Sequence, residues 1–66
     1  LNGANLSGAN LMNADLSRAF LKNADLTNAD LSGANLYDAI LTRTTMKGAI
    51  LCNTTISDGS VIYSGC

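Results

Sequence analysis

An apolar residue recurs at every fifth position along the whole 66-residue chain, and this period limits what the chain can fold into. In a straight α-helix, five steps rotate each apolar side chain by about 140° from the last, which would smear the series around the surface. In a straight strand, an odd repeat would put successive apolar residues on opposite faces. The sequence therefore predicts a chain that bends once per repeat, so that this series points to a common axis. The series comprises Leu1, Leu6, Leu11, Leu16, Leu21, Leu26, Leu31, Leu36, Leu41, Met46, Leu51, Ile56 and Val61.

The other repeat positions support the same interpretation. A small residue, usually Ala, stands two positions before each apolar residue, and Asn or Asp usually lies between them. The small residue fits a narrow interior that a larger side chain would overpack. Gly or Asn often precedes it, and these residues adopt the tight backbone conformations that a bend requires. Coils stacked about 4.8 Å apart can then pair their backbone groups with the coils above and below.

The pattern A(N/D)LXX, as in Ala4-Asn5-Leu6-Ser7-Gly8, resembles the pentapeptide-repeat proteins. The resemblance covers almost the whole chain. It implies an all-β fold, a right-handed quadrilateral parallel β-helix with four repeats per coil and about three coils. Residues twenty apart would then stack, and we expect the repeat solenoid over residues 1–51 and a hairpin-like cap over residues 52–66. The inward stacks would be Leu6, Leu26 and Met46; Leu11, Leu31 and Leu51; Leu16, Leu36 and Ile56; and Leu1, Leu21, Leu41 and Val61.

The repeat pattern loosens after Ala39, where Thr or Gly replaces several of the alanines, and the last fifteen residues contain both cysteines of the chain. An Asp-Gly dipeptide is typical of a hairpin turn. If residues 58–60 form a three-residue loop, Ser57 faces Val61, and counting outward places Cys52 opposite Cys66. The sequence therefore predicts a disulfide between Cys52 and Cys66, which would constrain the unfolded chain by about 3 kcal/mol and seal one end of the solenoid. The alternative is two free thiols.

The compartment follows from that choice. A disulfide favours an oxidising compartment such as the periplasm or thylakoid lumen, whereas free thiols make the cytoplasm the default. The tail of the chain, from Cys52 to Cys66, is also similar to the C-terminal tail of many cyanobacterial pentapeptide-repeat proteins. Two thiols without His fall short of the four ligands of a structural zinc site.

The composition offers little chemistry. There is no His or Glu, and the formal net charge is −1. We therefore expect no catalytic, cofactor or metal site, no nucleic-acid binding and no membrane insertion, and interpret the chain as a non-catalytic structural or protein-interaction module. The family also includes acidic members that imitate DNA and regulate gyrase. That alternative needs a long rod with a dense negative face, which five Asp among four basic residues do not provide.

Three apolar residues replace Asn or Asp at the outward position of the repeat: Phe20, Ile40 and Ile50. In the twenty-residue register, Phe20 stacks over Ile40, and we expect Ile50 on a neighbouring side. Stacked apolar residues form a patch, so these three are the candidate contacts for an unknown protein partner or for self-association. The alternative is an exposed ladder that only stabilises the stack.

Overall fold

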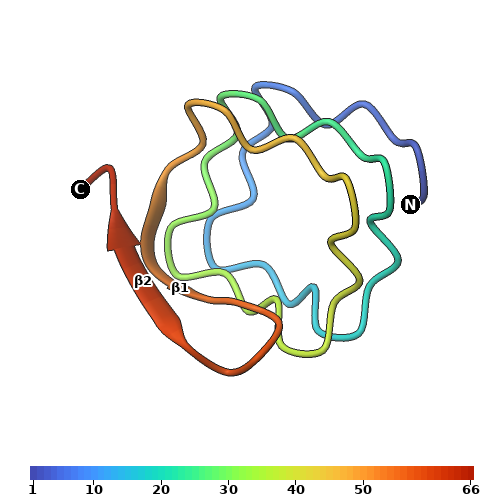
Figure 1. Ribbon diagram of the computed structural model, residues 1–66. Coiled ribbons are helices and arrows are strands. Elements are labelled where there is room, and N and C mark those ends of the chain that lie inside the picture. The colour runs from blue at the N-terminus through green and yellow to red at the C-terminus, as the bar shows by residue number, and fades with distance from the viewer.

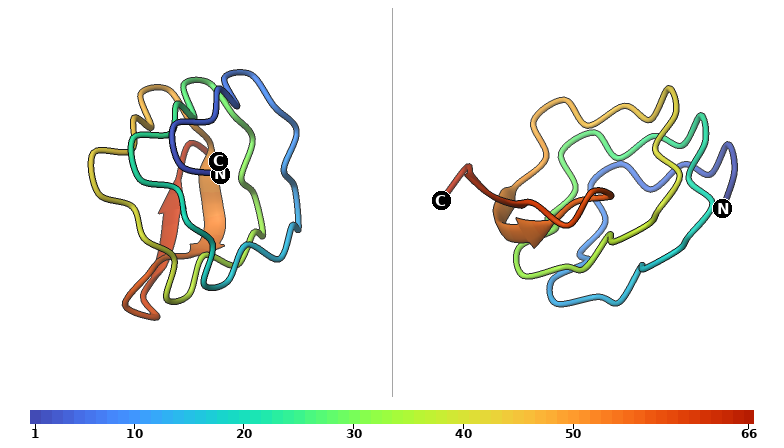
Figure 2. Two further views of the ribbon diagram at one scale, coloured as in Figure 1. Left: turned by 90° about the vertical axis from the view of Figure 1, so that its right-hand side faces the viewer. Right: turned by 60° about the horizontal axis from the view of Figure 1, so that its bottom comes forward.

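The computed structural model describes all 66 residues, and in it the chain winds around a central axis as a β-solenoid (Figure 1). Parallel β-bridges join residues that are twenty positions apart, so four repeats complete one turn, as the resemblance implied. Figure 2 shows the turns stacked along the axis, with a C-terminal hairpin beside the last of them. The bridged pairs are Asn5–Asp25, Asn10–Asp30, Asp15–Asn35, Phe20–Ile40, Asp25–Thr45, Asp30–Ile50 and Asn35–Thr55.

Each repeat bends at a four-residue turn. In the first one, the Leu1 carbonyl accepts a hydrogen bond from the Ala4 N–H at 3.0 Å, and Gly3 between them has φ +70°. A positive φ at the third residue alone is the requirement of a type II turn, which Gly and Asn meet most easily. Three turns carry a charged residue at this position instead: Arg18, Asp38 and Arg43, with φ of 63°, 61° and 55°.

The middle turn forms the core. Its four leucines, Leu21, Leu26, Leu31 and Leu36, are completely buried, and its alanines, Ala24, Ala29, Ala34 and Ala39, are at most 5% exposed. Most of the corresponding residues of the first and last turns are half-buried and pack against this layer. Leu1 and Gly59, at the two ends of the repeat series, are exposed, and Thr54 is completely buried. Inward placement of the apolar and the small residues is therefore confirmed for the repeats between these ends.

Two strands form the C-terminal hairpin: β1, Leu51–Thr55, and β2, Val61–Ser64. They pair antiparallel, with Thr55 opposite Val61 and Cys52 opposite Tyr63. The predicted register was therefore wrong, because the register shifts between Cys52 and Thr54, as at a β-bulge, and the connection between the strands is longer than three residues. The assignment of Val61 to an inward stack was also wrong, since β2 lies outside the solenoid and Val61 is 45% exposed.

Strand β1 belongs to both the solenoid and the hairpin. The Gly33 N–H donates to the Cys52 carbonyl, and the Asp38 N–H donates to the Ser57 carbonyl, so the last coil continues through residue 57. The expected boundary between residues 51 and 52 is therefore not a break in the backbone pairing. No helix of the structure is long and apolar enough to cross a bilayer.

Candidate interaction face and the disulfide-closed hairpin

Phe20 and Ile40 form an exposed apolar ladder on one side of the solenoid. The Ile40 N–H donates to the Ala19 carbonyl at 2.9 Å, and the Leu21 N–H donates to the Ile40 carbonyl at 3.0 Å, which fixes the two residues in adjacent coils. Their side chains are 59% and 41% exposed. We call this side, formed by residues 19–21 and 39–41, the Phe20–Ile40 face. The predicted stacking of Phe20 over Ile40 is thus present in the structure.

Charged turns border this face. Arg18 and Asp38 occupy the turns at which the chain enters the face in successive coils, and Lys22 and Arg43 occupy the turns at which it leaves. Arg18, Asp38 and Arg43 are also the three charged residues held at positive φ, where all other repeats carry Gly or Asn. For Arg this conformation costs roughly 1 to 3 kcal/mol. The turns that carry a charged residue in place of Gly or Asn therefore include unfavourable ones, and all of them border the Phe20–Ile40 face.

Ile50 does not join this ladder. Ile50 pairs with Asp30 and lies two repeats after Ile40. Because four repeats complete a turn, two repeats place Ile50 on the opposite side of the solenoid rather than on a neighbouring one. It is half-buried, and the C-terminal segment lies against it: a Cβ built on Gly65 would stand 3.4 Å from the Ile50 Cα. Ile50 therefore supports the chain end and leaves Phe20 and Ile40 as the exposed pair.

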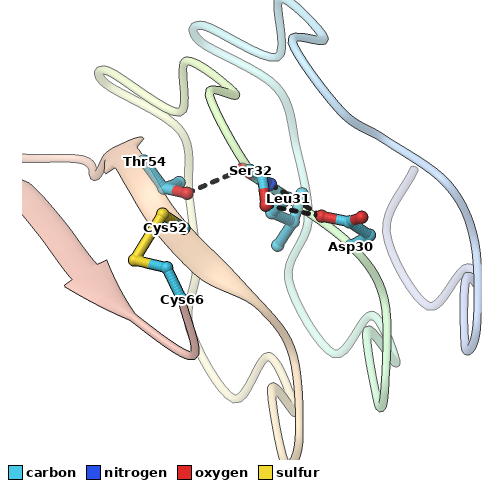
Figure 3. The surroundings of a disulfide bond; sticks show 6 residues. All are labelled: Asp30, Leu31, Ser32, Cys52, Thr54 and Cys66. Atoms are coloured by element: carbon cyan, nitrogen blue, oxygen red, sulfur yellow. Dashed lines mark hydrogen bonds between the residues drawn. A yellow bond between two sulfur atoms is a disulfide. The ribbon is translucent and has the colours of Figure 1, made fainter.

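A disulfide joins Cys52 to Cys66, with the Cα atoms 5.2 Å apart (Figure 3). Cys66 lies beyond the end of β2, opposite no residue of β1. Gly65, with φ +85°, redirects the chain after Ser64, and this turn brings Cys66 to Cys52 despite the shifted register. The disulfide thus ties the end of the chain to the last coil.

Thr54 carries a structural role that the sequence pattern did not reveal. It occupies the small-residue position, is completely buried, and its hydroxyl donates to the Leu31 carbonyl at 2.6 Å (Figure 3). Thr44 makes the equivalent bond to the Leu21 carbonyl at 2.6 Å. Replacement of Ala by Thr at two inward positions is the signal: a buried hydroxyl must find an acceptor.

The acidic residues of the repeats act locally. Asp25 Oδ1 accepts both the N–H and the hydroxyl of Thr27, at 3.0 and 2.5 Å, and the hydroxyl bond is the main cause that lowers the pKa of Asp25. The Ser17 hydroxyl and N–H lower the pKa of Asp15 in the same way. Because Asp15, Asp25 and Asp30 lie on three different sides of the solenoid, they form no continuous acidic face.

The structure contains no pocket and no group of three or more His, Cys, Asp or Glu side chains that could hold a metal ion.

The repeat region matches the family model described as pentapeptide repeats, with eight copies over residues 1–28 and 21–58. The chain belongs to the pentapeptide-repeat family. Members of this family are generally non-catalytic repeat modules. No curated protein matches this pentapeptide-repeat chain.

Two solved pentapeptide-repeat proteins from cyanobacteria resemble the chain. Rfr23 from Cyanothece 51142 is 34% identical with a TM-score of 0.53, over 91% of this chain and 44% of Rfr23. HetL from Nostoc sp. strain PCC 7120, described as involved in the regulation of heterocyst differentiation, is 30% identical with a TM-score of 0.42, over 94% of this chain and 40% of HetL. The chain thus spans less than half the length of either protein.

Proposed function

We propose that this chain is a non-catalytic protein-interaction module whose binding surface is the Phe20–Ile40 face. The observation that carries the proposal is the stacking of two exposed apolar residues at the one repeat position that elsewhere holds mostly Asn, Asp or Thr. Neither residue is needed for the backbone pairing, because polar residues make the same bridges on the other sides of the solenoid. Burial of the ladder against a partner would remove the exposed apolar surface of these two side chains from water.

The supporting scaffold is a right-handed four-sided solenoid of about three coils, which we propose from the family and from the twenty-residue pairing in 66 residues. Such a solenoid is rigid, because each coil is hydrogen-bonded to its neighbours through the backbone. It would present Phe20 and Ile40 at a fixed spacing, with little conformational entropy to lose on binding.

A photo-crosslinking experiment tests the proposed surface. A benzoyl-phenylalanine in place of Phe20 should crosslink to a protein in an extract of the cells that express the chain natively. The same group in place of Asn10, an exposed residue at the equivalent position on the opposite side, should not. Ile40→Asn, which restores a residue common at this position, should abolish the crosslink from position 20. Equal yields from both positions, or none from position 20, would overturn the proposal.

We further propose that the protein works in an oxidising compartment, such as a periplasm or a thylakoid lumen. The support is the Cys52–Cys66 disulfide, since disulfides persist where thiols are not kept reduced. Intact mass of protein isolated from its native cells under alkylating conditions tests this. We expect a mass two hydrogens below that of the dithiol, with no alkylation. Two alkylated cysteines would overturn this proposal and favour the cytoplasm.

A further inference from the structure

We propose that the partner of the Phe20–Ile40 face is the same face of a second copy, with the two solenoid axes antiparallel. This inference rests on the proposed interaction function and names its partner. It starts from the side chains of the face and of the turns that border it, residues 17–23 and residues 37–43, which adjoin through backbone hydrogen bonds.

A two-fold axis defines the contact. It lies in the plane between the two faces, perpendicular to the solenoid axis, and passes between the first and second coils. Each residue of the first coil then opposes the residue twenty positions later in the partner, and the reverse holds by symmetry. Phe20 therefore packs against Ile40 of the partner subunit, and Ile40 against Phe20 of the partner subunit. The same contact occurs twice, and all four apolar side chains are covered.

The charges at the entry turns are complementary in this arrangement. Arg18 of one copy opposes Asp38 of the partner subunit, and symmetry repeats the pair. Both side chains are exposed, and both stand at turns whose positive φ favours Gly or Asn. The proposed contact accounts for the retention of these two charged residues at that position, because each gains an ion pair across the interface.

The exit turns are compatible with the same contact. Lys22 opposes Thr42 of the partner subunit, and Asn23 opposes Arg43 of the partner subunit, so no two like charges lie directly opposite each other. A parallel arrangement of the two copies would instead bring Arg18 against Lys22 of the partner subunit, which is repulsive. The charge pattern therefore selects the antiparallel dimer over the parallel one.

Sedimentation equilibrium measures the association directly. The face is small, so dimers of twice the 6.8 kDa chain mass should form with a dissociation constant between about 10 μM and about 1 mM. Arg18→Asn should weaken the dimer about tenfold by removing both ion pairs. The variant should still fold, because Asn occupies the same turn position with the same positive φ at Asn13 and Asn23. Lys47→Asn, which removes one positive charge from another part of the solenoid, should leave the dimer unchanged.

A charge exchange completes the test. Arg18→Asp alone should abolish the dimer, and Arg18→Asp combined with Asp38→Arg should restore it. A monomer at all concentrations, or a dimer that is insensitive to these changes, would overturn the proposal. Crosslinking from position 20 separates this failure from that of the proposed function: a crosslink to a different protein would retain the interaction face and reject self-association, whereas no crosslink at all would reject both.

Discussion

Gly8 and Gly33 adopt the same backbone conformation, φ +70°, but differ in what lies beside them. A Cβ at Gly8 would have no atom within 4 Å, whereas a Cβ at Gly33 would collide with the side-chain oxygen of Asn13 in the coil above. Gly8→Ala should therefore lower the free energy of unfolding by about 1 kcal/mol through backbone strain alone. Gly33→Ala should cost somewhat more, because the exposed Asn13 side chain has to rotate away from the new Cβ. Urea denaturation followed by circular dichroism measures both.

A second substitution isolates the collision. Asn13→Gly removes the obstructing side chain and suits the positive φ at that turn. In the Asn13→Gly background, Gly33→Ala should cost no more than Gly8→Ala does in the wild type. A cost that stays as large as in the wild type would mean that contact with Asn13 does not determine the need for glycine at position 33.

The hydrogen bonds that Asp25 accepts from Thr27 make the stability of the fold depend on pH. They lower the pKa of Asp25 in the folded state below its value of 3.8 in the absence of these bonds. The carboxylate therefore stabilises the fold fully above the unfolded pKa, and this contribution is lost as pH falls through the lower folded pKa. We expect the temperature of half-unfolding to decrease as the pH is lowered below 3.8 and through the lower folded pKa of Asp25. Asp25→Asn should reduce this dependence while it retains an amide oxygen as acceptor, as Asn5 does with Ser7. An unchanged pH profile would contradict the assignment.

At the scale of single residues, the sequence predicted the periodic positions well and the exceptions poorly. The inward leucines and alanines could be identified because every repeat imposes the same environment on them. Arg18, Asp38 and Arg43 were not recognised as turn residues at positive φ, because the sequence signal for that conformation is Gly or Asn. Their conformation is set by the neighbouring coils, which hold the turn in place whatever its side chain.

The hairpin depends on its disulfide more than the coils do on any one contact. Strand β2 has four residues and is paired only with β1, and a short two-stranded hairpin is marginally stable by itself. Cys52→Ser with Cys66→Ser should lower the free energy of unfolding by about 3 kcal/mol. Amide hydrogen exchange should accelerate more in β2 than around Leu26 and Leu31. Equal acceleration in both regions would show that the disulfide stabilises the whole solenoid rather than its end.

The hairpin could be predicted from the sequence but its register could not. The Asp-Gly signal fixes where the chain reverses, whereas the shift near Asn53 and the turn at Gly65 depend on how β1 fits the coil above it. Cysteine pairing does not require the two residues to face each other across the strands, because Gly65 redirects the chain toward the solenoid. For this reason the predicted pair agrees with the structure although the register on which it rested was wrong.

At the scale of the whole molecule, one side of the solenoid carries the proposed function and the other sides carry the fold. The sequence placed Phe20 over Ile40 correctly because that relation depends only on the twenty-residue register. It placed Ile50 on a neighbouring side, although two repeats amount to half a turn. The antiparallel self-contact depends on where four charged residues lie on two adjacent coils: Arg18, Lys22, Asp38 and Arg43. Their positions relative to one another are known only once each residue is assigned to a side of the solenoid.

Because four repeats complete one turn, the number of repeats between two residues decides which of them lie on the same side of the solenoid. Insertion of one five-residue repeat after Leu26 would leave the coils intact but rotate everything that follows by one side, so that Asn35 would stand under Phe20 in place of Ile40. We expect this variant to fold and to lose the interaction at the Phe20–Ile40 face. Insertion of four repeats should return Ile40 to the side that Phe20 occupies, one coil further away. Gain or loss of single repeats in such a chain therefore exchanges the surfaces that it presents while it preserves the interior.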